Sequence, residues 1–157
     1  MTQPKNTKQF VDLDNARYDD QRQVMEEIIK AGHCPCCPKN FIQYNPDPFI
    51  REGEHWFLVP NRWPYENTKN HFLLITKDHI EAFSELSAAA SAELFELAAW
   101  AIKEFDIEGG ALALRFGDTD YSAGTVQHLH AQLIQPDIHL PNYSEKPVRL
   151  KIGKTRK

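Results

Sequence analysis

The sequence predicts an α+β fold built on an antiparallel sheet. Four segments have the apolar or alternating pattern of β-strands, whereas only two have the periodicity of helices. The strand segments are not regularly separated by helices, as they would be in a doubly wound parallel sheet. The expected strands are residues 55–60, 72–76, 111–116 and 128–134.

The composition fits a single domain that spans residues 1–157. Hydrophobic residues make up 41% of the chain and charged residues 25%, which is near the average for soluble globular proteins. No apolar run approaches the ~20 residues that are needed to span a bilayer, and the polar start of the chain lacks the apolar stretch of a signal peptide. We therefore expect a cytoplasmic protein with no membrane partner.

The charge is unevenly distributed. The net charge of −4 argues against a nucleic-acid partner, because such proteins are usually basic. The C-terminal tail, residues 145–157, nevertheless carries a net charge of +5, which leaves −9 for the rest of the chain. The tail is either a solvated terminus or an arm that attracts phosphate groups.

Two helices are expected. The N-terminal helix covers about residues 16–31, with Asp14 or Asn15 as its cap and Gly32 just after its end. Ser87 can cap a long second helix, which continues to about Phe105. The first helix has an apolar side of Val24, Met25, Ile28 and Ile29. The second has an expected buried stripe of Leu94, Phe95, Leu97, Ala98, Ala101 and Ile102.

The most informative segment is the last strand. Side chains alternate between the faces of a strand, so His128, His130 and Gln132 share one face. The polar loop 117–124 precedes this strand, and such loops present backbone N–H groups to anions. A neutral imidazole beside an anion-binding loop is suited to attack on phosphorus. Two alternatives are ordinary, partly exposed histidines, and a metal ion shared by His128 and His130.

All three cysteines lie in one tetrapeptide. Cys34 and Cys37 have the C-x₂-C spacing of half a zinc site, whereas three clustered cysteines cannot make a disulfide framework. A reduced, metal-free pair is the alternative. Redox chemistry is less favoured because no βαβ pattern surrounds the pair.

Three segments together resemble the histidine-triad (HIT) superfamily. Residues 124–133, with the sequence GTVQHLHAQL, resemble its signature, in which three histidines alternate with other residues. Residues 71–80 are similar to its second strand and the start of the helix that follows, and residues 58–62 with Pro64 to its nucleotide-contacting strand end. The resemblance covers about residues 33–136 and implies an antiparallel sheet of about five strands, with a long helix and an N-terminal helix.

The third histidine of the triad is replaced by Gln132. This form resembles the nucleotidyltransferase branch of the superfamily, which includes galactose-1-phosphate uridylyltransferase and diadenosine tetraphosphate phosphorylase. The stretch Trp63-Pro64-Tyr65-Glu66 also resembles the uridylyltransferases, although those enzymes carry two such halves and this chain carries one. A second departure is Ala123, which stands before Gly124 where related hydrolases have a glycine followed by glutamine.

The resemblance implies roles for individual residues. His130 would attack the α-phosphorus and carry a nucleotidyl group, with His128 as the first triad residue and Gln132 bonded to a phosphoryl oxygen. His71 would support the triad, and Phe57 or Trp63 would flank the base. The residues implied in phosphate and ribose binding are Asn61, Asp118, Gly124 and Thr125.

The resemblance also completes the zinc site. In zinc-containing relatives the two further ligands correspond to His79 and His128, which would join Cys34 and Cys37 around a structural ion. Cys36 or His33 could replace one of these ligands.

The function that follows is nucleotidyl transfer or hydrolysis through a covalent nucleotidyl-histidine. The substrate would be a purine nucleotide or a nucleotide sugar with a phosphoanhydride or phosphoramidate bond, and the resemblance implies a homodimer. The alternative is a nucleotide-binding or zinc-stapled interaction module with little or no catalysis.

Overall fold

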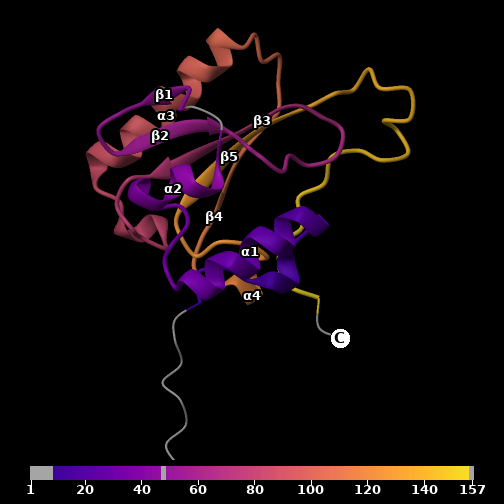
Figure 1. Ribbon diagram of the computed structural model, residues 1–157. Helices are drawn as coiled ribbons and strands as arrows, with labels where there is room; N and C mark the ends of the chain where they lie inside the picture. The colour runs from indigo at the N-terminus through magenta and orange to yellow at the C-terminus, as the bar shows by residue number, and fades with distance from the viewer. Residues whose placement is uncertain (1–8, 47–48, 156–157) are drawn as a thin grey trace, which may run out of the picture.

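The chain folds around a five-stranded antiparallel sheet with the strand order β1-β2-β3-β5-β4 (Figure 1). The structure is a computed structural model, and it describes residues 9–46 and 49–155. The strands are β1 (Arg51–Glu52), β2 (Trp56–Pro60), β3 (Thr68–Thr76), β4 (Ala111–Arg115) and β5 (His130–Pro136). Every neighbouring pair in this sheet is antiparallel, so the predicted α+β class is confirmed.

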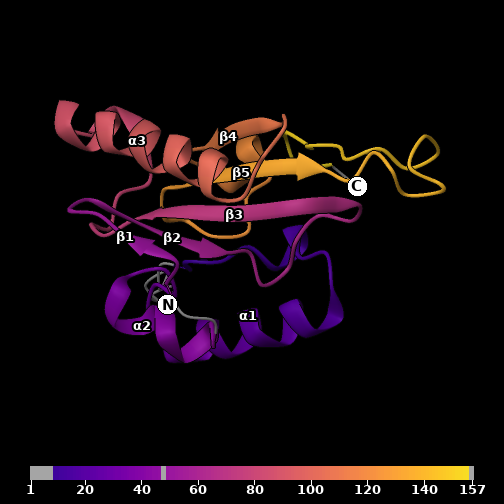
Figure 2. The same cartoon turned by 90° about the horizontal axis from the view of Figure 1, so that it is seen from above.

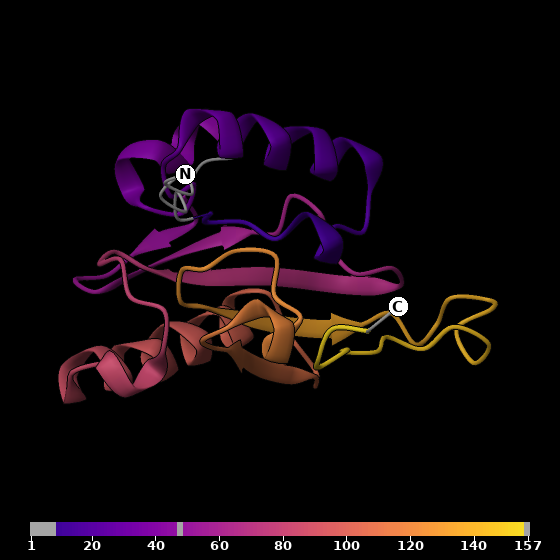
Figure 3. The ribbon, with the colours of Figure 1, turned by 90° about the horizontal axis from the view of Figure 1, so that it is seen from below.

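Helices cover both faces of the sheet. The long helix α3 lies on one face, and α1 and α2 lie on the other, as Figures 2 and 3 show from opposite sides. The α-helices are α1 (Asp19–Ala31), α2 (Pro38–Tyr44), α3 (Ala88–Glu104) and α4 (Thr119–Ser122), and two short 3₁₀ helices are Leu13–Asn15 and Phe83–Glu85. No helix within the described ranges is long and apolar enough to cross a membrane.

The face under α3 holds the larger core. Alternate residues of the inner strands point to it, among them Trp56, Leu74 and Ala131, all of which are fully buried. As predicted, Ser87 caps α3 by accepting a hydrogen bond from the Ala90 N–H at 3.1 Å. The buried stripe of α3 consists of Ala90, Leu94, Leu97, Ala98 and Ala101.

The prediction of a buried stripe was wrong at two positions. Phe95 is 66% exposed and Ile102 is 42% exposed. A helix that covers one sheet face buries a stripe of limited width, and both residues lie outside it. The stripe from Leu94 to Ala101 therefore makes the core, while these two apolar side chains remain on the surface.

The N-terminal helix begins later than predicted. It starts at Asp19 after Tyr18, because Asn15 lies in a 3₁₀ turn and uses its side chain elsewhere: its Nδ2 donates to the carbonyl oxygen of Gly124 at 2.8 Å. The predicted end is confirmed, since Gly32 follows the helix with φ of 68°, a left-handed conformation that glycine adopts readily.

The elements differ from the prediction at several places. The helix start implied at residues 77–80 was wrong, because the next helical turn is the 3₁₀ helix Phe83–Glu85. Helix α2 and strand β1 were not predicted, and each is short, with seven and two residues. Short segments give little periodic signal. Helix α4 lies inside the predicted polar loop, and β3 begins at Thr68 rather than at residue 72. Strand β5 begins at His130, so His128 lies just before it.

Candidate functional site

The two histidines of the signature lie in different surroundings on the same side of the sheet. Leu129, Ala131 and Leu133 point into the core under α3, so the predicted alternation of faces is confirmed. On the opposite side, His128 lies among the cysteines, whereas His130 and Gln132 line a cavity. These two places are a candidate metal centre and a candidate active site.

The candidate metal centre brings together all four predicted ligands: Cys34, Cys37, His79 and His128. The Nδ1 atom of His128 lies 3.2 Å from the Sγ of Cys34, 3.8 Å from that of Cys37 and 3.2 Å from the Nδ1 of His79. The Sγ of Cys37 lies 3.6 Å from the Nδ1 of His79. Residues that are far apart in the sequence thus place four soft or borderline donor atoms around one point.

These distances fit a zinc ion. Zinc binds sulfur at about 2.3 Å and imidazole nitrogen at about 2.0–2.1 Å, so donor atoms around one tetrahedral ion lie roughly 3.3–3.8 Å apart. The side chain of His128 is oriented for ligation, because its Nε2 donates to the carbonyl oxygen of Thr76 at 2.7 Å and leaves Nδ1 with a lone pair. Burial lowers the pKa of His128 to about 4, which keeps the imidazole neutral at pH 7, the form that binds metals.

One further contact and one pKa shift support the same donor set. The Nε2 of His79 lies 3.5 Å from a carboxylate oxygen of Glu81, and such outer carboxylates commonly orient metal-binding histidines. Burial raises the pKa of Cys34 to about 12, so a thiolate there needs a cation to stabilise it. The two substitutes that the sequence left open are not in the cluster: the Nε2 of His33 is 2.7 Å from the Tyr44 hydroxyl, and Cys36 is buried apart from it.

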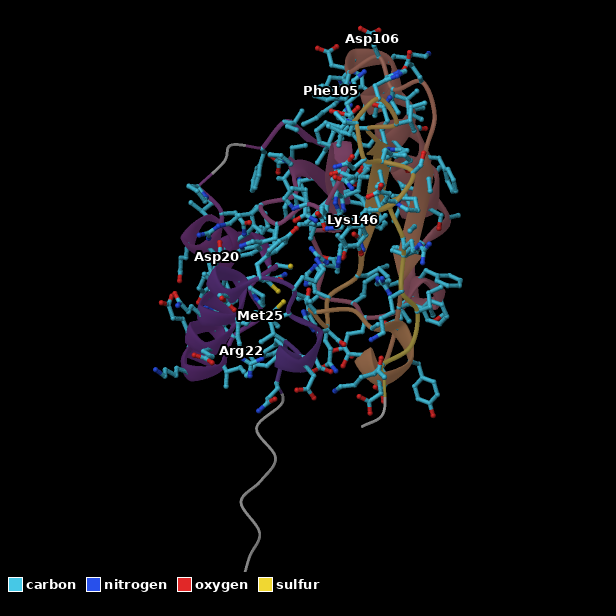
Figure 4. The ribbon with its side chains drawn as sticks, turned by 90° about the vertical axis from the view of Figure 1, so that its right-hand side faces the viewer. Asp20, Arg22, Met25, Phe105, Asp106 and Lys146 are labelled. Carbon is cyan, nitrogen blue, oxygen red and sulfur yellow. The ribbon has the colours of Figure 1, made fainter. Side chains whose placement is uncertain are left out.

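The candidate active site is a cavity of about 610 Å³ between the sheet, α1 and the C-terminal segment. Figure 4 shows α1, with Asp20 and Met25 labelled, opposite the sheet, and labels Lys146 on the C-terminal segment. Six of the residues predicted for the site line this cavity: Asn61, Trp63, Gly124, Thr125, His130 and Gln132.

His130 is held with one nitrogen free. Its Nδ1 lies 2.8 Å from the carbonyl oxygen of His128. A carbonyl can only accept a hydrogen bond, so Nδ1 carries the proton and Nε2 keeps its lone pair. Burial lowers the pKa of His130, and so does the nearby charge of Arg115. The residue therefore presents a neutral imidazole with an unprotonated Nε2.

A chain of hydrogen bonds orients Gln132. The backbone N–H of Tyr65 donates to the Nδ1 of His71 at 3.0 Å, so the proton of the neutral ring is on Nε2. That Nε2 lies 2.8 Å from the Oε1 of Gln132 and donates to it. Burial lowers the pKa of His71 to about 4, so the ring is neutral at pH 7. The amide oxygen of Gln132 is thus occupied by His71, which leaves the amide NH₂ group as the donor available to a ligand.

The loop before His128 is braced by the N-terminal segment. The Asp12 N–H donates to the carbonyl oxygen of Thr125 at 2.9 Å, and Val11 forms a β-bridge with Val126. Together with the bond from Asn15 to Gly124, these contacts fix the loop against a segment more than 100 residues away in the sequence. The loop therefore forms a rigid wall of the cavity.

Two of the predicted binding residues lie elsewhere. Asp118 does not appear among the described residues that line the cavity; its carboxylate instead caps α4 by accepting from the Asp120 N–H at 2.8 Å. Phe57 is only 1% exposed and packs against Phe41 and Phe49, so it cannot flank a base. Of the two aromatic candidates, Trp63 alone lines the cavity.

Sequence reasoning missed several residues of the cavity wall. Arg17, Tyr65 and Arg115 all line it, as do Lys146, Arg149 and Lys151 of the basic tail. Arg17 and Arg115 are isolated in the sequence, and no spacing pattern marks them. The only available signal was the positive charge of the tail. That charge was consistent with one of the two interpretations given above, an arm that attracts phosphate groups.

The comparison with solved structures finds the same architecture. A member of the HIT family from Bacillus subtilis aligns with 69% of this chain and 75% of its own, at 26% identity and a TM-score of 0.51. A HIT family hydrolase from Clostridium thermocellum aligns with 69% and 93%, at 20% identity and a TM-score of 0.53. A zinc-bound histidine triad family protein from Mycobacterium smegmatis aligns with 79% and 84%, at 19% identity and a TM-score of 0.52.

The chain has the fold of the histidine-triad (HIT) superfamily. The resemblance that the sequence predicts is therefore confirmed at the level of the superfamily, whereas the nucleotidyltransferase branch stays a prediction. No family model matches the chain, and no curated protein matches it.

The C-terminal segment returns to the cavity of the candidate active site and is tied at both ends. At one end the Asn67 side chain donates to the carbonyl oxygen of Lys146 at 2.8 Å. At the other end the Nζ of Lys154 lies 3.0 Å from carboxylate oxygens of Asp12 and Asp14, and 3.2 Å from one of Asp120. Hydrogen bonds to Asp12 and Asp14 raise the pKa of Lys154. In Figure 1 this segment runs from the loop after β5 back to α1 and α4.

We expect Lys154→Ala to release this segment. Without the ammonium group, three carboxylates lose their shared partner and repel one another. Trypsin should then cut after Arg149 and Lys151 several-fold faster than in the unaltered protein, as fragment mass spectrometry would record. The matched control is Lys103→Ala, which removes an exposed lysine from the end of α3. Equal cleavage rates in both variants would contradict the anchoring role of Lys154.

Proposed function

We propose that the protein transfers or hydrolyses nucleotidyl groups through a covalent bond to His130. The observation that carries the proposal is the free Nε2 of His130 beside the donor NH₂ of Gln132 in one cavity. An imidazole with a lone pair is a nucleophile, and an amide donor next to it can stabilise the negative charge on a phosphoryl oxygen. The name of the Clostridium thermocellum protein, a hydrolase, is in line with one of the two outcomes.

The reaction has two displacement steps. In the first, the lone pair of His130 Nε2 forms an N–P bond with the α-phosphorus, and the bond from phosphorus to the leaving group breaks with its electron pair. In the second, an oxygen of the acceptor attacks phosphorus, and the N–P bond breaks and returns the pair to Nε2. The acceptor loses its proton in this step if it is water, and needs to lose none if it is a phosphate oxyanion.

Gln132 limits the choice of leaving group. An amide can donate a hydrogen bond, but it cannot give up and regain a proton near pH 7. A histidine at this position could act as a general acid toward the leaving group, whereas glutamine cannot. We infer that the protein favours leaving groups that depart as stable anions, such as phosphates.

The remaining residues of the cavity have binding and positioning roles in this proposal. Asn61, Gly124 and Thr125 would contact the phosphate and ribose, and Trp63 would flank the base. His71 would act through Gln132, since it fixes the direction of the amide. The indole N–H of Trp63 donates to a carboxylate oxygen of Asp20 at 2.9 Å, which holds the ring at the mouth formed by α1.

The proposed zinc is structural. The protein supplies four ligands, so no coordination position is left for water or substrate. When bound, the ion would tie Cys34 and Cys37 to His128, two residues before the nucleophile, and thereby hold the start of β5 in place. The Mycobacterium smegmatis protein of the same fold is described as zinc-bound.

We expect His130→Ala to abolish a covalent adduct. Intact-protein mass spectrometry after mixing with dinucleoside polyphosphates or nucleotide sugars should show an added nucleoside monophosphate in the unaltered protein. The sample must be quenched at alkaline pH, because phosphoramidates are acid-labile. His139→Ala, which removes an exposed histidine just after β5, is the matched control and should keep the adduct.

Turnover retained by the His130→Ala variant would contradict the mechanism. Nucleotide binding without adduct or substrate consumption, in a folded protein, would favour the alternative of a binding module. That alternative rests on two departures from the family pattern. Gln132 replaces the third histidine, and the loop before the triad lacks the glutamine of related hydrolases.

We expect about one zinc ion per chain, and we expect its removal to lower the melting temperature, because the binding free energy adds to the free energy of folding. Elemental analysis should show the ion lost in Cys37→Ala and kept in Cys36→Ala. Both variants remove one thiol from the same tetrapeptide, but of these two cysteines only Cys37 belongs to the four-residue cluster. A full complement of zinc in Cys37→Ala, or none in the unaltered protein supplied with zinc, would contradict this assignment.

A homodimer also belongs to this proposal, as does a cytoplasmic location. Phe95 and Ile102 leave apolar surface exposed on α3, which a second copy could cover. Sedimentation velocity should give a mass of about twice the 18.1 kDa of one chain, and Phe95→Ser should shift the species toward monomer. A monomer at all accessible concentrations would exclude this arrangement.

A further inference from the structure

The cavity that holds His130 carries an excess of positive charge. Among the described residues two acidic ones line it, Asp14, which is paired with Lys154, and Glu66, whose carboxylate lies 3.7 Å from the Nζ of Lys146. The basic residues of its lining are Arg17, Arg62, Arg115, Lys146, Arg149 and Lys151. The chain as a whole is acidic, with a net charge of −4, so the positive charge is concentrated at the cavity. A ligand that carries only the α-phosphate would leave much of this charge without a partner.

Two of these arginines, Arg17 and Arg115, are fixed by one tyrosine. The guanidinium carbon of Arg17 lies 4.3 Å from the centroid of the Tyr65 ring, and a guanidinium nitrogen of Arg115 lies 3.4 Å from the Tyr65 hydroxyl. The guanidinium group of Arg17 also lies 5.8 Å from the centroid of the Tyr18 ring and donates to the carbonyl oxygen of Trp63. Arg115 donates to the carbonyl oxygen of Ser122. Both guanidinium groups are therefore oriented before any ligand binds.

Neither arginine has a negatively charged partner among the residues that the structure describes. Within residues 9–46 and 49–155, no carboxylate forms an ion pair with Arg17 or Arg115; carbonyl and hydroxyl oxygens accept their hydrogen bonds. Burial lowers the pKa of Arg17, and the charge of Arg115 lowers it further. Two like charges that are kept close without a counter-ion are costly, and a bound anion would remove that cost.

The arginine pair lies next to the nucleophile. Arg115 is the register partner of His130 across the β4–β5 ladder, and its guanidinium group donates to the carbonyl oxygen of Ser122 in the loop. A side chain added at Gly124 would meet the Cδ of Arg115 at 3.7 Å from its Cβ. The guanidinium group of Arg17 stacks on the ring of Tyr65. The backbone N–H of the same Tyr65 donates a hydrogen bond to the Nδ1 of His71. An anion on this pair would thus lie beside the group that His130 attacks.

The chemistry of the site needs a cation at this place. Gln132 cannot protonate the leaving group, so the leaving group must depart with its negative charge. Guanidinium groups stabilise phosphate oxygens through charge-assisted hydrogen bonds. The arginine pair supplies this stabilisation without a proton transfer.

We propose that Arg17 and Arg115 form a subsite for a phosphate of the leaving group, so that the protein prefers nucleotides with at least one phosphate beyond the α-phosphate over substrates with an uncharged leaving group. This inference rests on the proposed function of His130. It adds two substrate-contacting residues, and it defines the substrate class by the charge of the leaving group.

The first test compares two substrates of the same base. One is a dinucleoside tetraphosphate, whose leaving group is a polyphosphate, and the other is a nucleoside phosphoramidate, whose leaving group is an amine. Arg115→Gln and Arg17→Gln should lower kcat/KM for the tetraphosphate by about 10- to 100-fold, the range for a lost hydrogen bond to a charged group, and Arg115→Lys should lose less. The ratio of kcat/KM for tetraphosphate to phosphoramidate should fall at least tenfold.

Arg22→Gln is the matched control, because Arg22 is exposed, pairs with Glu26 on α1 and does not line the cavity. This variant should leave kcat/KM for both substrates unchanged. An equal fall for both substrates in the Arg17 and Arg115 variants would overturn the inference, since the arginines would then serve the α-phosphate or the fold.

The second test does not depend on catalysis. Calorimetric titration of the His130→Ala protein with inorganic pyrophosphate should show binding that Arg17→Gln and Arg115→Gln each weaken at least tenfold and that Arg22→Gln preserves. Zinc content is measured after each titration, so that chelation by pyrophosphate is not mistaken for binding. Pyrophosphate affinity that is absent, or unaffected by either arginine, would overturn the subsite. Arginine-dependent binding of pyrophosphate, together with neither adduct nor substrate consumption in the unaltered protein, would support the subsite and contradict the catalytic role of His130.

Discussion

The antiparallel pairing of β3 with β5 is the constraint on which the rest of the site depends. It sets Ile75 opposite His130 and Leu73 opposite Gln132, and the alternation of β5 sends the intervening side chains into the core under α3. A shift of this register by one residue would turn the polar face into the core. The burial of Leu129, Ala131 and Leu133 therefore fixes the direction of the histidines as firmly as any contact within the site.

This pairing gives three neighbouring imidazoles three different tasks. His128 donates through Nε2 to Thr76 and presents Nδ1 to the cysteines. His130 donates through Nδ1 to His128 and presents Nε2 to the cavity. His71 accepts at Nδ1 from Tyr65 and donates through Nε2 to Gln132. Backbone groups fix the tautomer in every case, so one ring can serve a metal, one a phosphorus atom and one an amide.

The sequence predicted the parts of this site that depend on local pattern. Alternation along the last strand predicted which residues share a face, and the family resemblance supplied the four residues that the structure gathers around one point. It could not predict that Arg17, Tyr65 and Arg115 meet, because these residues come from three distant segments with no common spacing. The resemblance implied that Asp118 lies in the binding site, whereas its carboxylate caps α4. Phe95 and Ile102 were assigned to the core on hydrophobicity alone, although α3 buries a narrower stripe.

The cavity is strongly basic although the protein as a whole is acidic, and the structure shows how its positive charges are held in place. The C-terminal segment, which brings positive charges to the cavity, is held at one end by the carboxylates of residues 12, 14 and 120 around Lys154 and at the other by the Asn67 side chain. The acidic residues of the chain thus serve partly to position the basic ones. Arg17 and Arg115, in contrast, are held by neutral oxygens and an aromatic ring, which leaves their charge for a ligand.

The proposed roles of His130 and His71 are tested most directly by measuring which ring nitrogen of each histidine carries the proton. Two-dimensional ¹H–¹⁵N NMR of the histidine side chains, in the zinc-supplied protein near pH 7, should show His130 protonated at Nδ1 with a free Nε2. It should show His71 in the opposite state, protonated at Nε2. The assignments would come from His130→Ala and His71→Gln. A His130 ring protonated at Nε2, or charged at both nitrogens, would have no lone pair facing the cavity and would contradict the central claim.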